Sequence, residues 1–325
     1  MSKALGLLSG GLDSSLAALA LKRQGVEVTG IVFVTPFFGA TRARQAAHRL
    51  DIPLIVENIG EIHLEVLKNP RYGYGKNLNP CIDCHALMFS LAARHVDKGD
   101  FDFLFSGEVL GQRPMSQNFN ALQIVAKHAG CADIILRPLC AKLLPVTPME
   151  EQGLVDREQL LDIQGRSRKP QEAYARQWGL QEYPGSGGGC LLTEKSYTGR
   201  LRDLLEHQPD CTVHDVELLN LGRQYRLSSS AKLTLGRNQE GNEALQAAAR
   251  PEYTLLHATV FRGPTGLVSG HPSPADLLLA AAIVAGNGKG RDEISVQVRL
   301  QHNGEDSLME VAPLSQDRSM LLQVA

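Results

Sequence analysis

The sequence predicts an α/β protein whose first half forms a doubly wound parallel sheet. Short apolar runs alternate there with amphipathic helical segments. The runs are mostly continuous rather than alternating in polarity, which is typical of strands that helices cover on both faces. After about residue 145 this rhythm stops, so we expect a sheet of about five strands that is complete by that point.

Each element of the sheet follows from its own stretch of sequence. Apolar, β-branched runs predict strands at residues 3–9, 26–35, 53–59, 101–107 and 132–139. Apolar residues at helical spacing predict helices between them, at residues 14–25, 40–51, 85–99 and 119–130. The order strand, helix, strand implies parallel neighbours joined by helical crossovers.

The remaining sequence divides into two further parts. Residues 146–208 read as several short helices and a glycine-rich loop that ends in Cys190, so we expect a helical extension that carries a distal cysteine. Residues 209–325 contain short strand-like runs and one apolar helix at 275–286. This pattern predicts a small α+β domain. The first domain is expected to span residues 1–145.

Composition excludes several classes of protein. The chain has 325 residues with 33 Lys and Arg against 35 Asp and Glu, so a nucleic-acid partner would need a local basic patch. The sequence shows no signal-peptide pattern and no apolar run long enough for a membrane span, so we expect a soluble, cytoplasmic protein with no membrane partner. Six cysteines are too few for a disulfide scaffold, which favours metal or redox chemistry for a close pair.

The string LLSGGLDSS, residues 7–15, lies where a strand runs into a helix. Its two glycines allow a ligand to approach the backbone, and the N–H groups of a helix start attract anions. The carboxylate of Asp13 would repel phosphate unless Mg²⁺ lies between them. The loop therefore predicts a nucleotide and magnesium site, although a simple glycine-serine turn is the alternative. It is neither a Walker A loop nor a dinucleotide fingerprint.

The string SGGLDSS resembles the pyrophosphate loop of the PP-loop ATP pyrophosphatases, also called adenine nucleotide alpha hydrolases, a superfamily with a HUP-like fold. The resemblance implies that ATP is split into AMP and pyrophosphate to adenylate a carbonyl oxygen. It implies a catalytic role for Asp13. The ATP-binding residues that it implies are Ser9, Gly10, Gly11, Leu12, Asp13, Ser14, Ser15, Phe33, Ser106 and Gly107.

The string NLNPCIDCHALMF, residues 77–89, places Cys81 and Cys84 at a loop-helix junction. Two cysteines at this spacing can supply two ligands of a metal or cluster, and Cys190, after three glycines, offers a third. This arrangement resembles the cluster-dependent tRNA thiolation branches of the PP-loop superfamily. The resemblance implies that the three cysteines are catalytic and bind a 4Fe-4S cluster whose fourth iron stays open to carry sulfur.

Two other uses of these cysteines remain open. The local strings also resemble the tRNA 2-thiouridylases and 4-thiouridine synthetases without a cluster, in which one thiol carries a persulfide and another resolves it. Alternatively, Cys81, Cys84, His85 and Cys190 could hold a structural Zn²⁺. The other three cysteines, Cys131, Cys140 and Cys211, are expected to be small buried hydrophobes. Among the histidines, His85 is expected in an exposed first turn, and His48 and His63 at the surface.

The segment LFSGEVLGQRPMSQN, residues 104–118, follows a predicted strand. Ser106, Gly107 and Glu108 should therefore lie at the carboxyl edge of the sheet, where open α/β sheets bind ligands. The segment resembles the second nucleotide-contacting segment of the thiolation enzymes. Polar residues there could reach phosphate or a base, or could be solvated loop residues; they are Gln112, Arg113 and Gln117. Lys142 could likewise contact phosphate or solvent.

The C-terminal part resembles the NFACT-R domain, an RNA-binding module, through the run LGRNQEGNEAL, a later LHA and a GPT turn. The resemblance implies contacts to RNA phosphates from a local basic patch. The alternative is a charged face exposed to solvent. The candidate residues are Arg223, Arg226, Lys232, Arg237 and Arg262.

Together these features predict an ATP-dependent RNA sulfurtransferase of the thiouridine synthetase type, acting on tRNA or another RNA. The expected cofactors are ATP, Mg²⁺ and a 4Fe-4S cluster, with Zn²⁺ as the alternative. The expected partners are the RNA and a sulfur donor, either sulfide or a cysteine desulfurase. Two rival functions remain: a PP-loop amidase or ligase with a structural zinc, and a non-catalytic RNA-binding adaptor that senses ATP.

Overall fold

The computed structural model describes residues 2–185 and 189–324. The chain divides into two compact units, Met1–Thr193 and Glu194–Ala325. Residues 146–193 of the expected extension lie in the first unit, and residues 194–208 lie in the second. In the described part of the chain, no helix is both long and apolar enough to cross a membrane.

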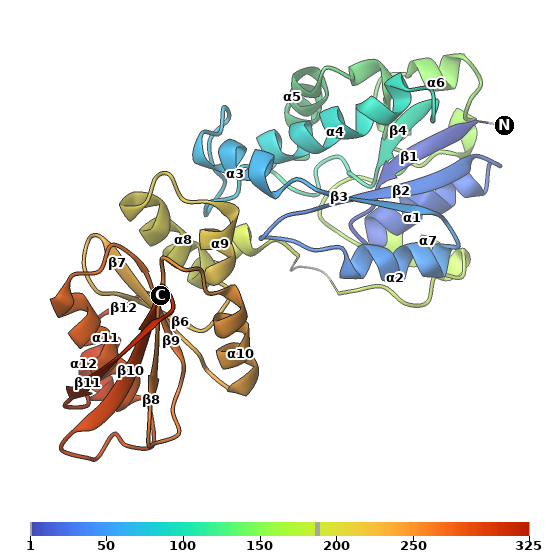
Figure 1. Ribbon diagram of the computed structural model, residues 1–325. Helices are drawn as coiled ribbons and strands as arrows, with labels where there is room; N and C mark the ends of the chain where they lie inside the picture. The colour runs from blue at the N-terminus through green and yellow to red at the C-terminus, as the bar shows by residue number, and fades with distance from the viewer. Residues whose placement is uncertain (1, 186–188, 325) are drawn as a thin grey trace. The chain divides into compact units, whose positions relative to one another are not determined.

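A parallel sheet of five strands forms the centre of the first unit (Figure 1). Its order is β3-β2-β1-β4-β5, and each pair of neighbours is parallel. The predicted doubly wound sheet is thereby confirmed. The strands are β1 (Lys3–Leu7), β2 (Glu27–Val34), β3 (Leu54–Asn58), β4 (Phe103–Ser106) and β5 (Ile135–Leu136).

Helices cover both faces of this sheet. Successive strand residues point to opposite faces, so Leu5 and Leu104 pack in one core with Phe89, while Ala4 and Phe103 pack in another. The first face carries α4 and α5, and the second carries α1, α2 and α7. The helices of the unit are α1 (Leu12–Lys22), α2 (Thr41–Leu50), α3 (Gly60–Lys68), α4 (Cys81–Asp97), α5 (Phe119–Ala129), α6 (Pro148–Glu151) and α7 (Lys169–Gln177).

The order of the strands fixes where a ligand can bind. The chain leaves β1 toward β2 and β3 on one side, then returns through α4 to place β4 on the other side of β1. The connections therefore diverge between β1 and β4, and a crevice at the carboxyl ends of two such strands is the usual ligand site of open α/β sheets. The loops after Leu7 and after Ser106 meet at this point.

The second unit is an α+β domain, as predicted. Its seven strands form an antiparallel sheet of order β11-β10-β8-β9-β7-β6-β12. They are β6 (Arg223–Arg226), β7 (Ala231–Leu235), β8 (Thr254–Ala258), β9 (Gly266–Gly270), β10 (Val296–His302), β11 (Glu305–Val311) and β12 (Gln323–Val324).

Helices also flank this second sheet on both faces. The apolar helix α11 shares a core with Val268, while α9 and α10 share one with Leu267, the preceding residue of β9. The start of α11 is fixed by a capping box in which Ser273 and Asp276 bond to each other's backbone N–H groups. The helices are α8 (Lys195–His207), α9 (Val213–Leu218), α10 (Gln239–Ala248), α11 (Pro274–Gly286) and α12 (Gln316–Met320).

Candidate functional site

The loop between β1 and α1 has the geometry of an anion site. Gly10 has φ +78°, and a Cβ on it would lie 2.3 Å from the carbonyl of Arg42, so only glycine fits. Gly11 is the N-cap of α1 and brings no side chain to its first N–H groups. These groups can therefore face a phosphate with the positive end of the helix dipole behind them. The hydroxyls of Ser9 and Ser14 lie 3.2 Å apart beside them.

The end of β4 lies directly against this loop. A Cβ on Gly107 would come within 2.5 Å of the backbone nitrogen of Ser14 and 2.6 Å of the carbonyl carbon of Asp13. Such distances exclude any side chain larger than hydrogen. The segment after β4 and the loop after β1 thus form one continuous surface at the carboxyl edge of the sheet.

Asp13 has one carboxylate oxygen in use and one unused. Its Oδ2 accepts a hydrogen bond of 2.8 Å from Nε2 of Gln112. Its Oδ1 is buried and has no hydrogen-bond partner among the described residues. An unshared carboxylate oxygen beside an anion-binding loop has the chemistry of a Mg²⁺ ligand. The residues present therefore fit the magnesium ion that the sequence led us to expect.

Five of the expected ATP-binding residues have buried side chains: Leu12, Ser14, Ser15, Phe33 and Ser106. Leu12 and Ser15 are 0% and 3% exposed, and Phe33, in β2, is 2% exposed within the core beneath α4. They support the loop from below rather than facing a ligand. Ser106 is also buried, and its hydroxyl donates to Glu108 at 3.1 Å.

Glu108 is the centre of a buried charge network beside the loop. Its Oε2 accepts from Nε of Arg137 at 2.8 Å, and its Oε1 accepts from Nδ1 of His85 at 2.8 Å. Burial by itself would raise the pKa of Glu108, but Arg137 and His85 lower it to about 2. The carboxylate therefore stays charged at neutral pH and connects the end of β4 to the first turns of α4.

Cys81 and Cys84 lie in the first turn of α4, which begins at Cys81 after Pro80. Nδ2 of Asn79 donates to Sγ of Cys81 at 3.1 Å, and Nε2 of His63 lies 3.3 Å from Sγ of Cys84. Burial raises the pKa of the Cys84 thiol well above its ordinary value, and the neighbouring Cys190, Cys81 and Asp83 raise it further. The Cys84 thiol is therefore protonated in the metal-free protein at neutral pH.

Two hydrogen bonds hold the segment that follows Cys190 against the first unit's loops. The N–H of Leu191 donates to the carbonyl oxygen of Phe37 at 3.0 Å, and Nδ2 of Asn77 donates to the carbonyl of Thr193 at 2.7 Å. The effect of Cys190 on the pKa of Cys84 shows that the two thiols are electrostatic neighbours. The three predicted cysteines therefore interact electrostatically, but among the described residues they form no group that could hold a metal ion. Of the three glycines before Cys190, Gly187 and Gly188 lie outside the described residues.

The described side chains do not separate the two predicted metals. Across residues 2–185 and 189–324, no three His, Cys, Asp or Glu side chains form a group that could hold a metal ion. His85, the histidine of the zinc alternative, is bonded to Glu108 through Nδ1, an arrangement that is common for zinc-ligating histidines. Cysteine thiolates are ligands of both zinc and iron-sulfur clusters.

The structure corrects the prediction for His63, which is buried rather than at the surface. It is 0% exposed, and its ring packs between Phe37 and Phe38 with centroid distances of 5.5 and 5.6 Å. Burial lowers the pKa of His63 to about 4, so the ring is neutral at pH 7. The prediction for His85 was also wrong, because Glu108 holds it. His48 is exposed, as expected.

Cys131, Cys140 and Cys211 are buried, as predicted, at 8%, 0% and 2% exposed. The candidate RNA or phosphate contacts after β4 differ from one another. Gln112 faces Asp13 rather than solvent, and Gln117 is buried at 6% exposed. Arg113 is exposed. Lys142 donates to the carbonyl oxygen of Glu158 at 2.7 Å.

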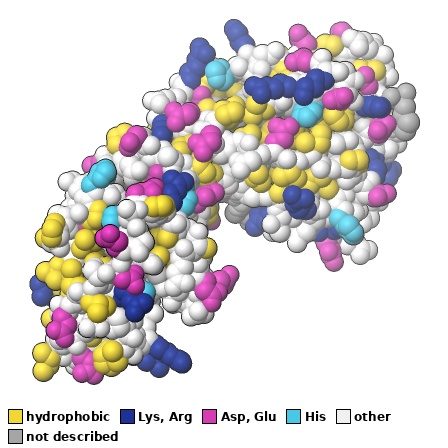
Figure 2. Space-filling model, in the orientation of Figure 1, with side chains coloured by type: hydrophobic (Ala, Val, Ile, Leu, Met, Phe, Trp, Pro, Cys, Tyr) yellow, Lys and Arg dark blue, Asp and Glu magenta, His cyan; other side chains and the backbone are white. Residues whose placement is uncertain are grey.

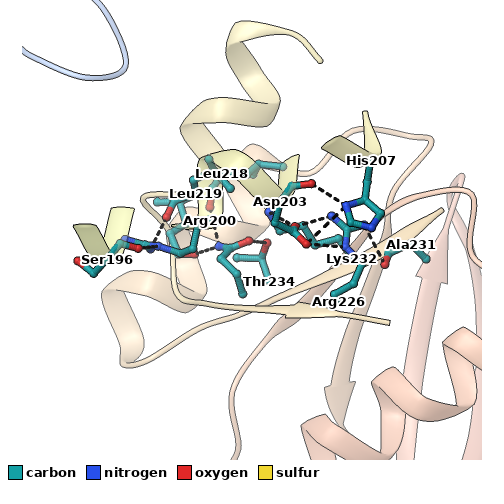
Figure 3. Close-up of polar contacts among 12 residues, drawn as sticks. Ser196, Arg200, Asp203, His207, Leu218, Leu219, Arg226, Ala231, Lys232 and Thr234 are labelled. Atoms are coloured by element: carbon teal, nitrogen blue, oxygen red, sulfur yellow. Dashed lines mark hydrogen bonds and ion pairs between the residues drawn. The ribbon is translucent and has the colours of Figure 1, made fainter. Parts of the chain in front are cut away.

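The candidate cations of the second unit also differ. Arg226 donates twice to Asp203 of α8, at 3.0 and 2.5 Å, and Nζ of Lys232 lies 3.9 Å from the same carboxylate (Figure 3). Arg223 donates to the side chain of Asn287 at 2.9 Å. These three cations therefore balance or bind groups within the domain.

Lys232 is 5% exposed, and burial lowers its pKa to about 8 although Asp203 opposes the shift. This departs from the free phosphate contact that we expected, because a solvent-accessible patch requires exposed cations. Arg237 and Arg262 are exposed. On the face drawn in Figure 2, basic and acidic side chains are interspersed rather than gathered by sign.

Comparison with known proteins identifies both parts of the chain. Residues 1–142 match the family described as thiamine biosynthesis protein (ThiI), and residues 222–320 match the family described as NFACT protein RNA binding domain. The tRNA-specific 2-thiouridylase MnmA of Sulfurimonas denitrificans is 36% identical over 113 residues, which cover 32% of this chain and 33% of the relative. That of Dichelobacter nodosus is 28% identical over 218 residues, covering 62% and 55%.

A probable tRNA sulfurtransferase of Thermoanaerobacter sp. is 27% identical over 176 residues, covering 52% of this chain and 43% of that protein. The chain thus spans about a third to about a half of the length of these relatives. A solved 4-thiouridine synthetase in complex with RNA and ATP covers 66% of this chain at 19% identity with a TM-score of 0.41. The N-terminal part of the chain is thus similar to the ThiI family, and the C-terminal part is similar to the NFACT RNA binding domain.

Proposed function

We propose that this protein is an ATP-dependent RNA sulfurtransferase that replaces a carbonyl oxygen of a base, in tRNA or another RNA, with sulfur. One observation supports the proposal: contacts connect the nucleotide loop to α4, the helix that begins at Cys81. Gly107 abuts Asp13, the next residue, Glu108, is bonded to His85, and His85 follows Cys84 on α4. The proposed activating site and the cysteines of the proposed sulfur-bearing site would thus share one edge of the sheet.

The proposed reaction has two displacements. The carbonyl oxygen of the base attacks the α-phosphorus of ATP, the bond to the bridging oxygen breaks, and pyrophosphate leaves. Hydrosulfide then adds to the activated carbon, the carbon-oxygen bond breaks, and AMP leaves with the former carbonyl oxygen. The hydrosulfide proton is released to water. The base has exchanged oxygen for sulfur, and no oxidant or reductant is required.

Residues of the loop would serve the first displacement. The N–H groups at the start of α1 would bind the phosphate oxygens and stabilise the charge that develops on them. Magnesium, held through Oδ1 of Asp13, would supply further charge neutralisation when bound. Gly10 and Gly107 would let the nucleotide lie against the backbone.

The cysteines would serve the second displacement by holding reactive sulfur. A 4Fe-4S cluster bound through Cys81, Cys84 and Cys190 would supply a place for inorganic sulfur that needs no thiolate nucleophile from the chain. A persulfide on one of the three cysteines, loaded by a cysteine desulfurase, is the other form, and it requires a second thiol to resolve it.

The NFACT-type domain at residues 222–320 would supply RNA affinity. The exposed Arg237 and Arg262 are its candidate phosphate contacts among the predicted cations. Which RNA and which base are modified are questions for the assay, since the chain spans only part of its thiolating relatives.

The test is an anaerobic assay with ATP, Mg²⁺, sulfide and total tRNA, followed by nucleoside mass spectrometry. Wild-type protein should form a thiolated nucleoside only when ATP is present. Asp13→Asn and the alanine variants of Cys81, Cys84 and Cys190 should form none, while Cys131→Ala, a buried cysteine away from the site, should retain activity. RNA binding without thiolation under all conditions would favour the adaptor, and ATP-dependent amide formation with one bound zinc would favour the ligase.

A further inference from the structure

Asp13 is the first member of a series of partly buried hydrogen bonds that reaches α7. Nε2 of Gln112 donates to Oδ2 of Asp13 at 2.8 Å, and Nε2 of Gln171 donates to Oε1 of Gln112 at 2.9 Å. Gln171 lies in the first turn of α7 and is 0% exposed. The two amides thus link the nucleotide loop to a helix that is far away in the sequence.

The charge on Asp13 determines which groups donate and which accept in this series of hydrogen bonds. A carboxylate only accepts hydrogen bonds, so Gln112 must present its NH₂ group to it. The carbonyl oxygen of Gln112 then faces Gln171, which must present its own NH₂ group in turn. Oε1 of Gln171 is left buried with no partner among the described residues. A buried acceptor without a donor costs free energy, so this arrangement is maintained against that cost.

The hydrogen bond from Gln112 also determines which carboxylate oxygen of Asp13 remains available to a ligand. Gln112 occupies Oδ2 and fixes the plane of the carboxylate, while Oδ1 stays buried and unshared among the described residues. A metal ligand is usually oriented by such a second shell of hydrogen bonds. We infer that Gln112 and Gln171 are positioning residues of the cation site, which hold Asp13 so that Oδ1 faces the magnesium ion of the bound nucleotide.

This inference rests on the proposed function, because it assumes that the loop binds a nucleotide with magnesium. It adds two residues to the site, one of them supplied by the segment after the sheet. It also gives Gln112 a different role from the RNA contact that the sequence suggested. Gln171 would act only through Gln112, and Gln112 only through Asp13.

The decisive variant is Gln171→Met, which keeps the approximate size of the side chain and removes both of its hydrogen-bonding groups. Calorimetry with α,β-methylene ATP, whose α-β bridge cannot be cleaved, gives the nucleotide Kd in Mg²⁺ and in EDTA. The ratio of the two Kd values measures how strongly magnesium supports binding. We expect Gln171→Met to reduce this ratio by about 10-fold to 100-fold, the usual effect of losing a second-shell partner, with the Kd in EDTA unchanged.

A merely structural role for Gln171 would weaken nucleotide binding equally in Mg²⁺ and in EDTA, and that result would overturn the inference, as would an unchanged ratio. Gln171→Leu, which also lacks both hydrogen-bonding groups, should reproduce the loss if the methionine variant folds poorly. Gln177→Met, at an exposed position on the same helix, is the matched control and should behave as wild type. This test measures nucleotide binding and not thiolation. A wild-type protein that binds magnesium nucleotide but thiolates no RNA would therefore refute the proposed function, while the comparison of Kd values in Mg²⁺ and in EDTA would still test the positioning role of Gln171.

Discussion

Nε2 of His63 lies 3.3 Å from Sγ of Cys84, and the ring of His63 contacts the rings of Phe37 and Phe38. Nδ1 of His63 is buried and has no partner among the described residues. A buried acceptor without a donor is tolerated better than a buried N–H without an acceptor. The ring proton is therefore better placed on Nε2, from which it is donated to the sulfur of Cys84.

The reactivity of Cys84 should reflect this burial. In the metal-free protein, alkylation of Cys84 by iodoacetamide should be slow at neutral pH and should rise through the alkaline range, because burial raises the pKa of its thiol well above the ordinary 9.0. Peptide fragmentation by mass spectrometry resolves Cys84 from Cys81. Faster labelling of Cys84 than of Cys81 at pH 7 would contradict this description.

The buried pair of Glu108 and Arg137 should make a pH-dependent contribution to stability. Folding lowers the pKa of Glu108 from 4.5 to about 2, so the contribution is present above 4.5 and is lost as the pH falls toward 2. Glu108→Gln leaves Arg137 buried without a charge partner, which should cost about 3–5 kcal/mol at pH 7.

Urea unfolding of wild type and Glu108→Gln at several pH values measures this contribution. The difference between them should shrink on the acid side. Glu158→Gln, at a side chain that is 87% exposed and 3.6 Å from Lys142, is the control and should change stability by less than about 1 kcal/mol. A difference for Glu108→Gln that is constant with pH would mean that the charge of Glu108 is not what stabilises the fold.

Gly107 should tolerate no side chain. In Gly107→Ala the new methyl group would meet the backbone of Asp13 and Ser14, so the loop must move. We expect a loss of about 1–3 kcal/mol in unfolding free energy and a loss of nucleotide binding. Gly39→Ala, where a Cβ would meet nothing within 4 Å, is the matched control. Nucleotide binding that survives in Gly107→Ala would show that the end of β4 does not shape the site.

Cations of the NFACT-type domain should separate into two groups. Arg237→Ala should weaken RNA binding and lower the slope of log K against log salt by about 1, as the loss of a phosphate contact does. Arg226→Ala should instead destabilise the domain, because it breaks a two-bond contact with Asp203. Fluorescence titration at several salt concentrations, with thermal melts, distinguishes the two. An unchanged salt slope in Arg237→Ala would remove Arg237 from the interface.

The fold was predictable because its signals are local. The periodicity of strands and helices can be recognised within short stretches of sequence. The glycines of the string SGGLDSS likewise predict a turn after β1, where Gly10 has a positive φ. The role of the three cysteines stays a prediction, and the sequence could not report that Cys190 influences the pKa of Cys84.

The contacts between residues that are far apart in the sequence could not be predicted in the same way. Gln112 and Gln171 are separated by 59 positions, and glutamine in a helix ordinarily faces solvent. His63 did carry a signal that the prediction overlooked: the buried positions of α3 are Gly60, His63, Leu64 and Leu67, which follow the helical spacing of a core-facing stripe. Lys232 is buried beside Asp203 of α8, and no pattern in the sequence around Lys232 predicts this burial.

The central claim is that ATP activation and sulfur transfer occur on this one chain. The most direct measurement uses tRNA whose base carbonyls are labelled with ¹⁸O. This tRNA is incubated anaerobically with the protein, sulfide and unlabelled ATP, and the nucleosides and the AMP are then analysed by mass spectrometry. We predict a thiolated nucleoside together with AMP that contains ¹⁸O, because the displaced carbonyl oxygen leaves on AMP. Unlabelled AMP, or no thiolated nucleoside in the presence of ATP, would contradict the account.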